Sequence, residues 1–329
     1  MPQPLLVRDD DPDFAGEFAA AVLAGLSQPQ KVIPARFFYD RIGSELFEAI
    51  TGLPEYYPTR TEIGILTQNA AAIAASIGPG RAVIEFGSGS SAKTPLLLRA
   101  TAPAAYVPVD ISAEFLQQSA GALAADFPGL PVLPVAADFT APFRLPASIT
   151  ALPKLGFFPG STLGNLAPDA AIDLLRGFAA TLGEGSWLLI GLDNAPGEGK
   201  SQGSLEAAYD DAQGVTAAFN LNLLHRMNRE LGGTINTADF AHRAVWNADL
   251  GRIEMHLVAR RDTGFTVAGQ PFSLTAGAYI HTENSHKWTL IEQRLMARAS
   301  GWTPHSCWMD PAGLFAVHLW RRPVPAMAP

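Results

Sequence analysis

Short apolar runs alternate with helix-like patterns between residues 60 and 195. The predicted strands are residues 82–86, 106–110, 131–135, 154–158 and 187–192. The predicted helices are 59–77, which opens on the capping-box spacing of Thr59 and Glu62, and 94–102, 113–127 and 168–182. Because the strands are apolar throughout and helices separate them, we expect a doubly wound parallel sheet covered on both faces.

The end of the chain has a different pattern. A helix is predicted over residues 290–300, and two strands over 306–308 and 314–320 are joined by the tight turn Asp310–Gly313. An antiparallel hairpin therefore closes a sheet that is otherwise parallel. This ending resembles that of class I S-adenosylmethionine (SAM)-dependent methyltransferases, which are Rossmann-like α/β proteins with a seven-stranded sheet. An ordinary dinucleotide-binding fold lacks it.

Residues 197–286 interrupt the alternation of strands and helices. They open with a Gly/Ser-rich link, continue with a helical stretch over 205–231, and include strand 252–260, which has a half-buried period-two pattern. We expect two domains. One comprises 59–196 and 287–329, the predicted cofactor-binding domain. The other is an α+β substrate-binding domain or lid formed by 1–58 and 197–286.

Composition excludes several classes of function. The net charge is −8, from 31 acidic against 23 basic residues, and no Lys/Arg cluster predicts a nucleic-acid partner. The one cysteine, Cys307, excludes an internal disulfide and a cysteine-based metal centre. The start of the chain lacks a signal-peptide pattern, and no apolar run approaches the ~18 residues of a membrane span. We expect a cytoplasmic monomer that binds no membrane.

A glycine-rich turn follows the first strand and predicts a nucleotide-like ligand. Gly87, Ser88 and Gly89 allow the backbone to approach such a ligand closely. Taken with Asp110, the spacing Gly87-x-Gly89-x-x-Ala92 also matches a nicotinamide fingerprint, which is a weak signal by itself.

Acidic residues near this turn favour SAM over nicotinamide. Glu85 precedes the glycines, and Asp138-Phe139 offers an acceptor and an aromatic face to an adenine, while Asp110 suits two ribose hydroxyls. The alternative is that these acids only cap strand ends. Lys93 either approaches the methionine carboxylate or is a solvated lysine at a helix start.

Candidate substrate residues come from two distant segments. Tyr39, Tyr56 and Tyr57 offer apolar faces with polar tips, which suit an ammonium group, although ordinary packing explains them equally well. Glu283 and Ser285 share one face of an extended segment and suit an N–H donor such as imidazole, with a capping network as the alternative. No His/acid set has metal-ligand spacing, so no metal is expected.

Several segments together resemble the ergothioneine-pathway L-histidine Nα-methyltransferases, which use SAM to convert histidine to hercynine, its trimethylbetaine. The matching segments are 36–40, 43–47, 53–60, 87–94, 108–110, 160–165, 208–211, 214–220, 252–255 and 282–285. They follow the same order over nearly the whole chain, and the tyrosine-rich and 214–220 segments are the most specific.

The resemblance implies a role for individual residues. The implied cofactor residues are Tyr39, Gly87, Ser88, Gly89, Lys93, Asp110, Asp138 and Phe139, with S-adenosylhomocysteine as the product. The implied histidine-binding residues are Tyr56, Asn165, Tyr209, Thr216, Met255, Glu283 and Ser285. Tyr39 and Asn165 would orient the reacting amine. The alternatives are an N-methyltransferase of the same fold acting on another amino acid or small amine, a non-catalytic SAM-binding scaffold, and a nicotinamide dehydrogenase.

Overall fold

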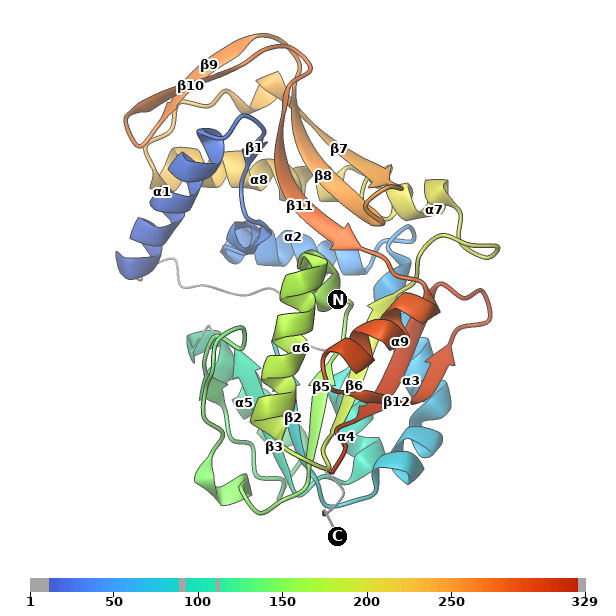
Figure 1. Cartoon of the computed structure of the whole chain (residues 1–329). Helices are drawn as coiled ribbons and strands as arrows, with labels where there is room; N and C mark the ends of the chain where they lie inside the picture. The colour runs from blue at the N-terminus through green and yellow to red at the C-terminus, as the bar shows by residue number, and fades with distance from the viewer. Residues whose placement is uncertain (1–11, 89–92, 111–112, 325–329) are drawn as a thin grey trace. The chain divides into compact units, whose positions relative to one another are not determined.

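The computed structural model describes residues 12–88, 93–110 and 113–324 (Figure 1). The chain divides into two compact units, each built from separate stretches of sequence. Unit 1 contains Pro58–Lys200 and Lys287–Pro329, and unit 2 contains Leu6–Tyr57 and Ser201–His286. The predicted roles of the two parts, cofactor binding and substrate binding, stay predictions.

Unit 1 contains a seven-stranded sheet with the order β12-β13-β6-β5-β2-β3-β4. Its strands are β2 (Ala82–Phe86), β3 (Ala105–Asp110), β4 (Val135–Ala136), β5 (Lys154–Phe158), β6 (Trp187–Asp193), β12 (Thr303–Met309) and β13 (Phe315–Arg321). The five strands from β2 to β6 run parallel, and β13 pairs antiparallel with both β6 and β12. The predicted class I methyltransferase fold is confirmed.

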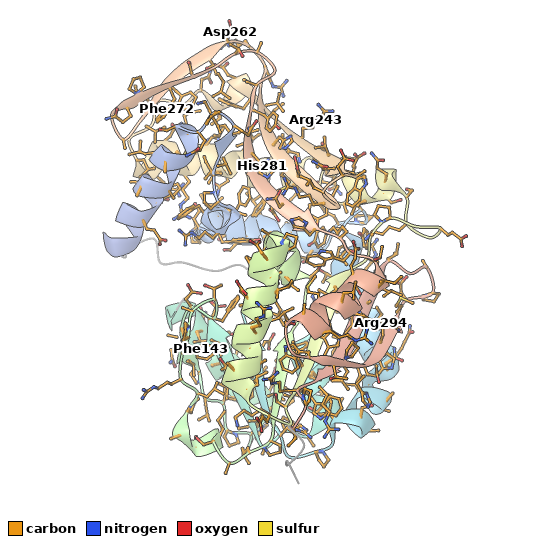
Figure 2. The ribbon with its side chains drawn as sticks, viewed as in Figure 1. Phe143, Arg243, Asp262, Phe272, His281 and Arg294 are labelled. Atoms are coloured by element: carbon orange, nitrogen blue, oxygen red, sulfur yellow. The ribbon has the colours of Figure 1, made fainter. Side chains whose placement is uncertain are left out.

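Helices cover both faces of this sheet because side chains of each strand alternate between the faces. The helices are α3 (Tyr57–Ile77), α4 (Thr94–Thr101), α5 (Ala113–Asp126), α6 (Pro168–Leu182) and α9 (Leu290–Ala299). Ile84 of β2 belongs to a core shared with α6 and α9, whereas its neighbour Val83 belongs to a core shared with α3 and α4. Side chains fill the space between each face and its helices (Figure 2).

Two local predictions for unit 1 are wrong. The third strand spans only Val135–Ala136, and the prolines around Val132 and Leu133 leave a single bridge, Tyr106 to Val132, ahead of it. The capping-box spacing at Thr59 and Glu62 does not start a helix, because α3 already begins at Tyr57. A true capping box opens α9 instead, between Thr289 and Glu292.

Unit 2 contains a four-stranded sheet with the order β1-β11-β8-β7 and a separate hairpin of β9 and β10. These strands are β1 (Lys31–Val32), β7 (Phe240–Asn247), β8 (Arg252–Ala259), β9 (Thr263–Val267), β10 (Gln270–Leu274) and β11 (Tyr279–His286). The α-helices are α1 (Pro12–Leu26), α2 (Arg41–Thr51), α7 (Gln202–Ala207) and α8 (Val215–Glu230), and a 3₁₀ turn η1 spans Ala35–Phe38.

The helical stretch predicted over 205–231 is broken into α7 and α8. Gly214 has φ +74° directly before α8, a conformation that ends a helical path. Asp211 then accepts the backbone N–H groups of Val215 and Thr216 at 3.0 and 2.7 Å, which caps the new helix. Tyr209 therefore lies in the loop between the two helices, where it is buried.

Across the described part of the chain, no helix is both long enough and apolar enough to cross a membrane.

Candidate active site

The order of strands in unit 1 marks where an open α/β sheet binds its ligands. Beginning at β2, the chain adds β3 and β4 on one side and β5 and β6 on the other, so the order reverses between β2 and β5. Crevices at such switch points lie beyond the carboxyl ends of the strands. Gly87 follows β2, Asp110 ends β3 and Asn165 follows β5, so the topology brings these predicted residues to one edge, together with Gly160.

The glycine turn leaves β2 with a positive φ. Gly87 has φ +74°, and its N–H donates to the Val109 carbonyl at 2.8 Å, as does Ser88 N–H at 3.2 Å. The turn is therefore tied to the end of β3. Among the described residues, the buried Ser88 Oγ has no hydrogen-bond partner, which leaves a polar atom for a ligand. The predicted Gly89 lies outside the described residues.

Glu85 serves a structural role that the sequence did not predict. Its carboxylate is fully buried and accepts hydrogen bonds from Thr94 Oγ1 and Tyr106 Oη, both at 2.7 Å. Burial, followed by the charge of Glu85, raises the pKa of Tyr106 well above its ordinary value, so its hydroxyl keeps its proton. The acid thus joins β2 to β3 and α4 from within the unit.

Lys93 is buried, which contradicts the alternative of a solvated lysine. Its Nζ lies 2.5 Å from Glu62 Oε2, and the exposed fractions of the two side chains are 2% and 1%. The same carboxylate oxygen accepts the N–H of Gly160 at 2.9 Å. Glu62 therefore links the start of α4 to the loop that follows β5, two segments at the edge where the ligand is expected.

The remaining predicted cofactor residues differ in their environments. Asp110 is fully buried at the end of β3. Asp138 is exposed and accepts Thr140 N–H at 2.8 Å and Thr140 Oγ1 at 2.6 Å, so it closes an Asx-type turn. The ring of Phe139 packs in the core, with ring centroids 5.8 and 6.2 Å from those of Phe158 and Phe178. Its ring is thus already used in packing.

Asn165 ends a 3₁₀ turn, η3 (Thr162–Asn165), that begins after Ser161 in the left-handed region at φ 59°. Ser161 is held there because its Oγ accepts the N–H of Asp193 at 3.0 Å. Within the described ranges of the chain, the buried Asn165 Oδ1 has no hydrogen-bond partner. A buried amide oxygen without a donor is costly unless a ligand supplies one.

The other predicted substrate residues all belong to unit 2. The rings of Tyr56 and Tyr209 meet edge to face at 6.1 Å. Phe47 of α2 lies between two of the tyrosines, at 6.3 Å from Tyr56 and 5.7 Å from Tyr39, and Phe219 of α8 lies 5.6 Å from Tyr39. All five side chains are buried. The sequence analysis assigned no role to Phe47 or Phe219.

Tyr39 remains a neutral phenol in this environment. Burial is the main cause that raises its pKa well above the ordinary value, and the nearby Glu283, Tyr56 and Tyr209 add to the effect. These contributions place the tyrosines and the carboxylate of Glu283 in one neighbourhood. A neutral aromatic lining with one carboxylate suits a cationic or N–H-bearing ligand.

The sheet of unit 2 presents Glu283 and Ser285 on one face, as their spacing predicts. Glu283 is the cross-strand partner of Met255, and Ser285 that of Ile253, so these four side chains share a face. Ser285 Oγ lies 2.9 Å from Tyr209 Oη, which joins the sheet to the aromatic cluster. The structure thus brings together the predicted Tyr39, Tyr56, Tyr209, Met255, Glu283 and Ser285.

A chain of hydrogen bonds supports Tyr209 from behind. Thr282 Oγ1 donates to Asn220 Oδ1 at 2.9 Å, and Asn220 Nδ2 donates to His242 Nδ1 at 2.8 Å. His242 Nε2 in turn donates to the Tyr209 carbonyl at 2.8 Å. Burial lowers the pKa of His242, which keeps the ring neutral and able to accept at Nδ1. Thr216, also predicted, is buried in the first turn of α8.

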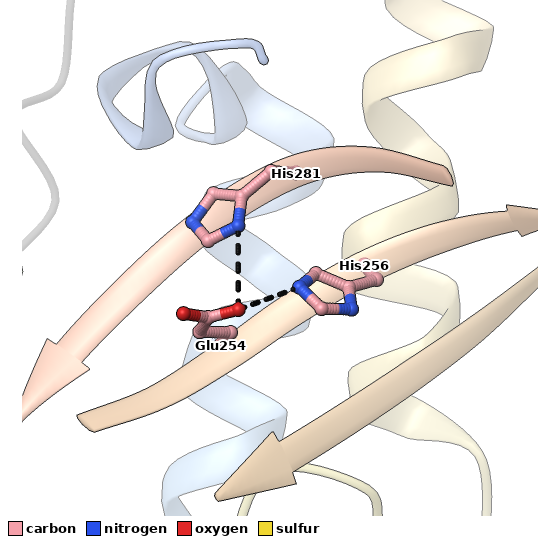
Figure 3. A group of neighbouring side chains, drawn as sticks. All are labelled: Glu254, His256 and His281. Atoms are coloured by element: carbon pink, nitrogen blue, oxygen red, sulfur yellow. Dashed lines mark hydrogen bonds and ion pairs between the residues drawn. The ribbon is translucent and has the colours of Figure 1, made fainter. Parts of the chain in front are cut away.

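A second group of polar side chains in unit 2 was missed. Glu254, His256 and His281 converge on one point, although His281 is 25 residues from His256 in sequence (Figure 3). Strand β8 therefore lacks the half-buried alternation predicted for it, since Glu254 and His256 are buried as well as Ile253 and Met255. Burial lowers the pKa of His256 to about 4. Only strand pairing could have revealed this group.

Comparison with known proteins gives a consistent result. The family model for histidine-specific, SAM-dependent methyltransferases matches residues 18–322. Histidine N-alpha-methyltransferase of Mycolicibacterium smegmatis is 40% identical over 308 residues, which cover 91% of this chain and 92% of the relative. The protein of that name from Mycobacterium tuberculosis is 37% identical over 91% of this chain and 92% of its own length. A more distant relative, 4-dimethylallyltryptophan N-methyltransferase of Claviceps fusiformis, is 25% identical over 92% of this chain and 91% of its own.

Proposed function

The chain belongs to the family of histidine-specific, SAM-dependent methyltransferases, and we propose that it transfers three methyl groups from SAM to the α-amine of L-histidine. The product would be hercynine, and the reaction the first step of ergothioneine biosynthesis. The observation that carries the choice of substrate is the face of unit 2 that presents Glu283 and Ser285 beside three buried tyrosines.

The residues of unit 1 fit a nucleoside ligand with a charged tail. Asp110 at the end of β3 would accept the ribose hydroxyls, and the Gly87 turn would approach the ligand through its backbone, where Ser88 Oγ has no hydrogen-bond partner among the described residues. Lys93, held by Glu62, would contribute positive charge near the ligand's carboxylate. When bound, SAM supplies an electrophilic methyl group on a sulfonium.

The residues of unit 2 would hold histidine by its side chain. Glu283 is suited to accept an imidazole N–H, and Ser285, oriented by Tyr209, would bond the other ring nitrogen. An imidazole offers two ring nitrogens to this carboxylate and hydroxyl, whereas an indole offers only one, its N–H donor. This set therefore favours histidine over the tryptophan derivative named for the fungal relative.

Three successive transfers impose a requirement on the groups around the amine. The amine attacks as a free base, so one proton must leave before each transfer, and we expect water to take it. Tyr39 and Asn165 would orient the amine through a phenol and an amide oxygen. Neutral aromatic faces stabilise the growing positive charge without requiring an N–H, so they tolerate one, two or three methyl groups.

A direct test is incubation with SAM and L-histidine, followed by mass spectrometry. We expect a product that carries three added methyl groups from histidine and little or no product from tryptophan or other amino acids. Efficient methylation of another amino acid, with histidine unchanged, would select the alternative substrate. A protein that binds SAM but methylates nothing would support the scaffold alternative.

The substrate assignment is tested separately by Glu283→Gln. We expect histidine affinity to fall by about tenfold or more, because a charged hydrogen bond contributes about 1.5–3 kcal/mol, while SAM affinity stays the same. Glu48→Gln on the exposed surface of α2 is the matched control. Isothermal titration calorimetry that gives equal histidine affinities for Glu283→Gln and the wild type would refute the imidazole assignment.

A further inference from the structure

Three potential ligand atoms converge between strands β8 and β11 of unit 2. His256 Nε2 lies 3.0 Å from Glu254 Oε2, and His281 Nδ1 lies 3.7 Å from the same oxygen (Figure 3). All three ligand atoms lie within 4.8 Å of one another. The side chains are 9%, 8% and 12% exposed for Glu254, His256 and His281, so the group is shielded from solvent and still reachable.

A β-bulge places this group on the face opposite to the candidate histidine pocket. His281 pairs with His256, but the next pairing along β11 is Glu283 with Met255, so Thr282 is an extra residue. The bulge turns His281 and Asn284 toward the face of Glu254 and His256. Glu283 and Ser285 stay on the other face. The group is therefore separate from the site already described.

The hydrogen bonds of His281 leave an acceptor facing another acceptor. Its Nε2 lies 2.8 Å from Asn284 Oδ1, and an amide oxygen only accepts, so Nε2 carries the proton of the neutral ring. The lone pair on Nδ1 then faces Glu254 Oε2. Two facing acceptors repel each other unless a cation lies between them. His256 Nε2 is hydrogen-bonded to the same oxygen, so a cation bound at this point would take the place of that proton and would face the Nδ1 lone pair of His281 as well.

Neighbouring residues orient the carboxylate in the way that a metal site requires. Arg252 donates to Glu254 Oε1 through Nε and Nη2, at 2.9 and 2.7 Å, and Asn247 Nδ2 donates to it at 3.0 Å. These bonds all engage Oε1 and leave Oε2 for the histidines. Such outer partners fix ligand orientation around metals. The His256 ring is itself held by stacking on Tyr279 at 4.0 Å.

We propose that Glu254, His256 and His281 bind a divalent transition metal ion, with Zn²⁺ as the best match. Two imidazole nitrogens and one carboxylate oxygen form a ligand set that zinc accepts, with water in the fourth position. Ligand atoms around a tetrahedral zinc ion are about 3.4 Å apart, close to the 3.0 and 3.7 Å separations of this group. The ion would join β8 to β11, the strands that carry Met255 and Glu283.

Two arginine side chains near this group lower its affinity for a cation. Arg252 compensates the charge of Glu254, and Arg243 of β7 is the cross-strand partner of His256 (Figure 2). The ligand set with Arg252 is thus close to neutral. This favours a metal that binds neutral imidazole strongly over Ca²⁺ or Mg²⁺, which prefer several carboxylates and other oxygen ligands.

The test uses the full-length, tag-free protein after treatment with a chelator. ZnCl₂ is titrated by calorimetry, and the melting temperature is followed with and without zinc. We expect one zinc ion per chain and a higher melting temperature, since a ligand that binds only the folded state stabilises it. MgCl₂ at the same concentration should give neither effect. Absence of zinc binding by the wild-type protein would overturn the proposal.

Variants show whether these residues are the ligands. His281→Gln and Glu254→Gln should weaken zinc binding more than about a hundredfold, beyond the effect typical of an outer partner. His225→Gln, which removes an exposed histidine of α8, is the matched control and should bind like the wild type. Equal zinc affinity in His281→Gln and wild type, or loss of binding in His225→Gln, would contradict the assignment.

A measurement on the wild type removes any dependence on how the variants fold. Long-range ¹H–¹⁵N correlation spectra report each imidazole nitrogen. Zinc should shift Nε2 of His256 and Nδ1 of His281 and leave the ring of His225 unchanged. If the zinc-induced shifts fall on other histidines, the ion binds elsewhere and the proposal fails.

Discussion

The carboxyl edge of the unit 1 sheet and the candidate pocket of unit 2 bury polar groups in different ways. At the edge in unit 1, the buried polar groups include two sets of ion pairs. Glu62 pairs with Lys93, and Asp193 at the end of β6 contacts Lys200 at 2.6 Å and Lys287 at 2.8 Å. The candidate pocket of unit 2 instead consists of phenols, aromatic rings and a hydroxyl around one carboxylate.

This difference corresponds to two different tasks. An ion pair holds two backbone segments at a defined separation, as Glu62 does for the loop after β5 and Lys93. Asp193 likewise holds Lys200 and Lys287, the two residues at which the chain leaves and re-enters unit 1. A pocket in which an amine is converted to a permanently charged trimethylammonium group is better lined by neutral groups, because fixed positive charges would repel the product.

The largest effect is expected from Asp193→Asn, which removes the charge on which the unit 1 pattern depends. Burial by itself raises the pKa of Asp193, but Lys200 and Lys287 outweigh it and hold this pKa below its ordinary value. The variant removes the carboxylate charge that both buried ammonium groups contact, so we expect a loss of about 3–5 kcal/mol in the free energy of unfolding. Urea unfolding followed by tryptophan fluorescence measures it.

The control for that prediction is Asp173→Asn, which breaks an exposed pair with Arg176. An exposed ion pair contributes about 0–1 kcal/mol, so this variant should be close to wild type. If both variants lose the same small amount of stability, the buried ion pairs of unit 1 do not have the structural role assigned to them.

Unit 1 also buries a titratable group in its neutral form, the imidazole of His318. Burial, with a smaller contribution from Arg294, lowers the pKa of His318 to about 4 from an ordinary 6.5. The unfolded chain therefore takes up this proton before the folded protein does. Stability is complete above pH ~7 and falls by up to about 3 kcal/mol as the pH drops through 6.5 toward 4.

The measurement for His318 is the free energy of unfolding at several pH values in wild type and His318→Gln. The glutamine retains hydrogen-bonding capacity toward Gln293, which His318 contacts through Nε2. We expect a flatter pH profile for the variant between pH 4 and pH 6.5. Parallel profiles for the two proteins would show that His318 does not titrate in the way described.

In unit 2 the comparable test breaks a neutral network. Thr282→Val removes the hydroxyl that donates to Asn220 Oδ1 and leaves this buried oxygen without that donor. The expected loss in the free energy of unfolding is about 2 kcal/mol, smaller than for a buried charge. Calorimetric unfolding measures it, with Thr266→Val, at a half-buried threonine of β9, as the control. A larger loss than that of Asp193→Asn would reverse the comparison.

The smallest effect is expected from Tyr209→Phe, which removes the hydroxyl that contacts Ser285 and preserves the ring. A single neutral hydrogen bond contributes about 1 kcal/mol, so histidine affinity should fall by about fivefold with SAM affinity unchanged. Tyr279→Phe, at a tyrosine of β11 that stacks on His256, is the control. Unchanged histidine affinity in Tyr209→Phe would remove this hydroxyl from the proposed pocket.

Much of unit 1 was predictable because its helices and strands follow from patterns among neighbouring residues. Strand β5 and helix α6 have the predicted bounds. The strand begins and ends with its apolar run, and a proline and a glycine mark the two ends of the helix. The closing hairpin was predicted for the same reason. The capping-box spacing at Thr59 failed because the carboxylate of Glu62 makes a long-range ion pair with Lys93, which no local pattern contains.

Unit 2 was less predictable from local patterns. The spacing of Glu283 and Ser285 placed both on one face, but only the bulge at Thr282 directs His281 to the other. Likewise, Phe47 and Phe219 become part of the tyrosine cluster only when α2 and α8 pack together. Family resemblance, rather than pattern, supplied the roles of Tyr209, Asn165 and Met255.

The parallel sheet, its closing hairpin, the family and the expected ligands could be predicted from the sequence, because periodicity and motifs are properties of neighbouring residues. Which charges neutralise each other and which polar side chains meet depends on the fold. Glu62 with Lys93, Asp193 with its two lysines, and Glu254 with His256 and His281 each depend on partners from different elements. A buried polar group is stable only beside its partner, and only the fold brings such partners within contact distance.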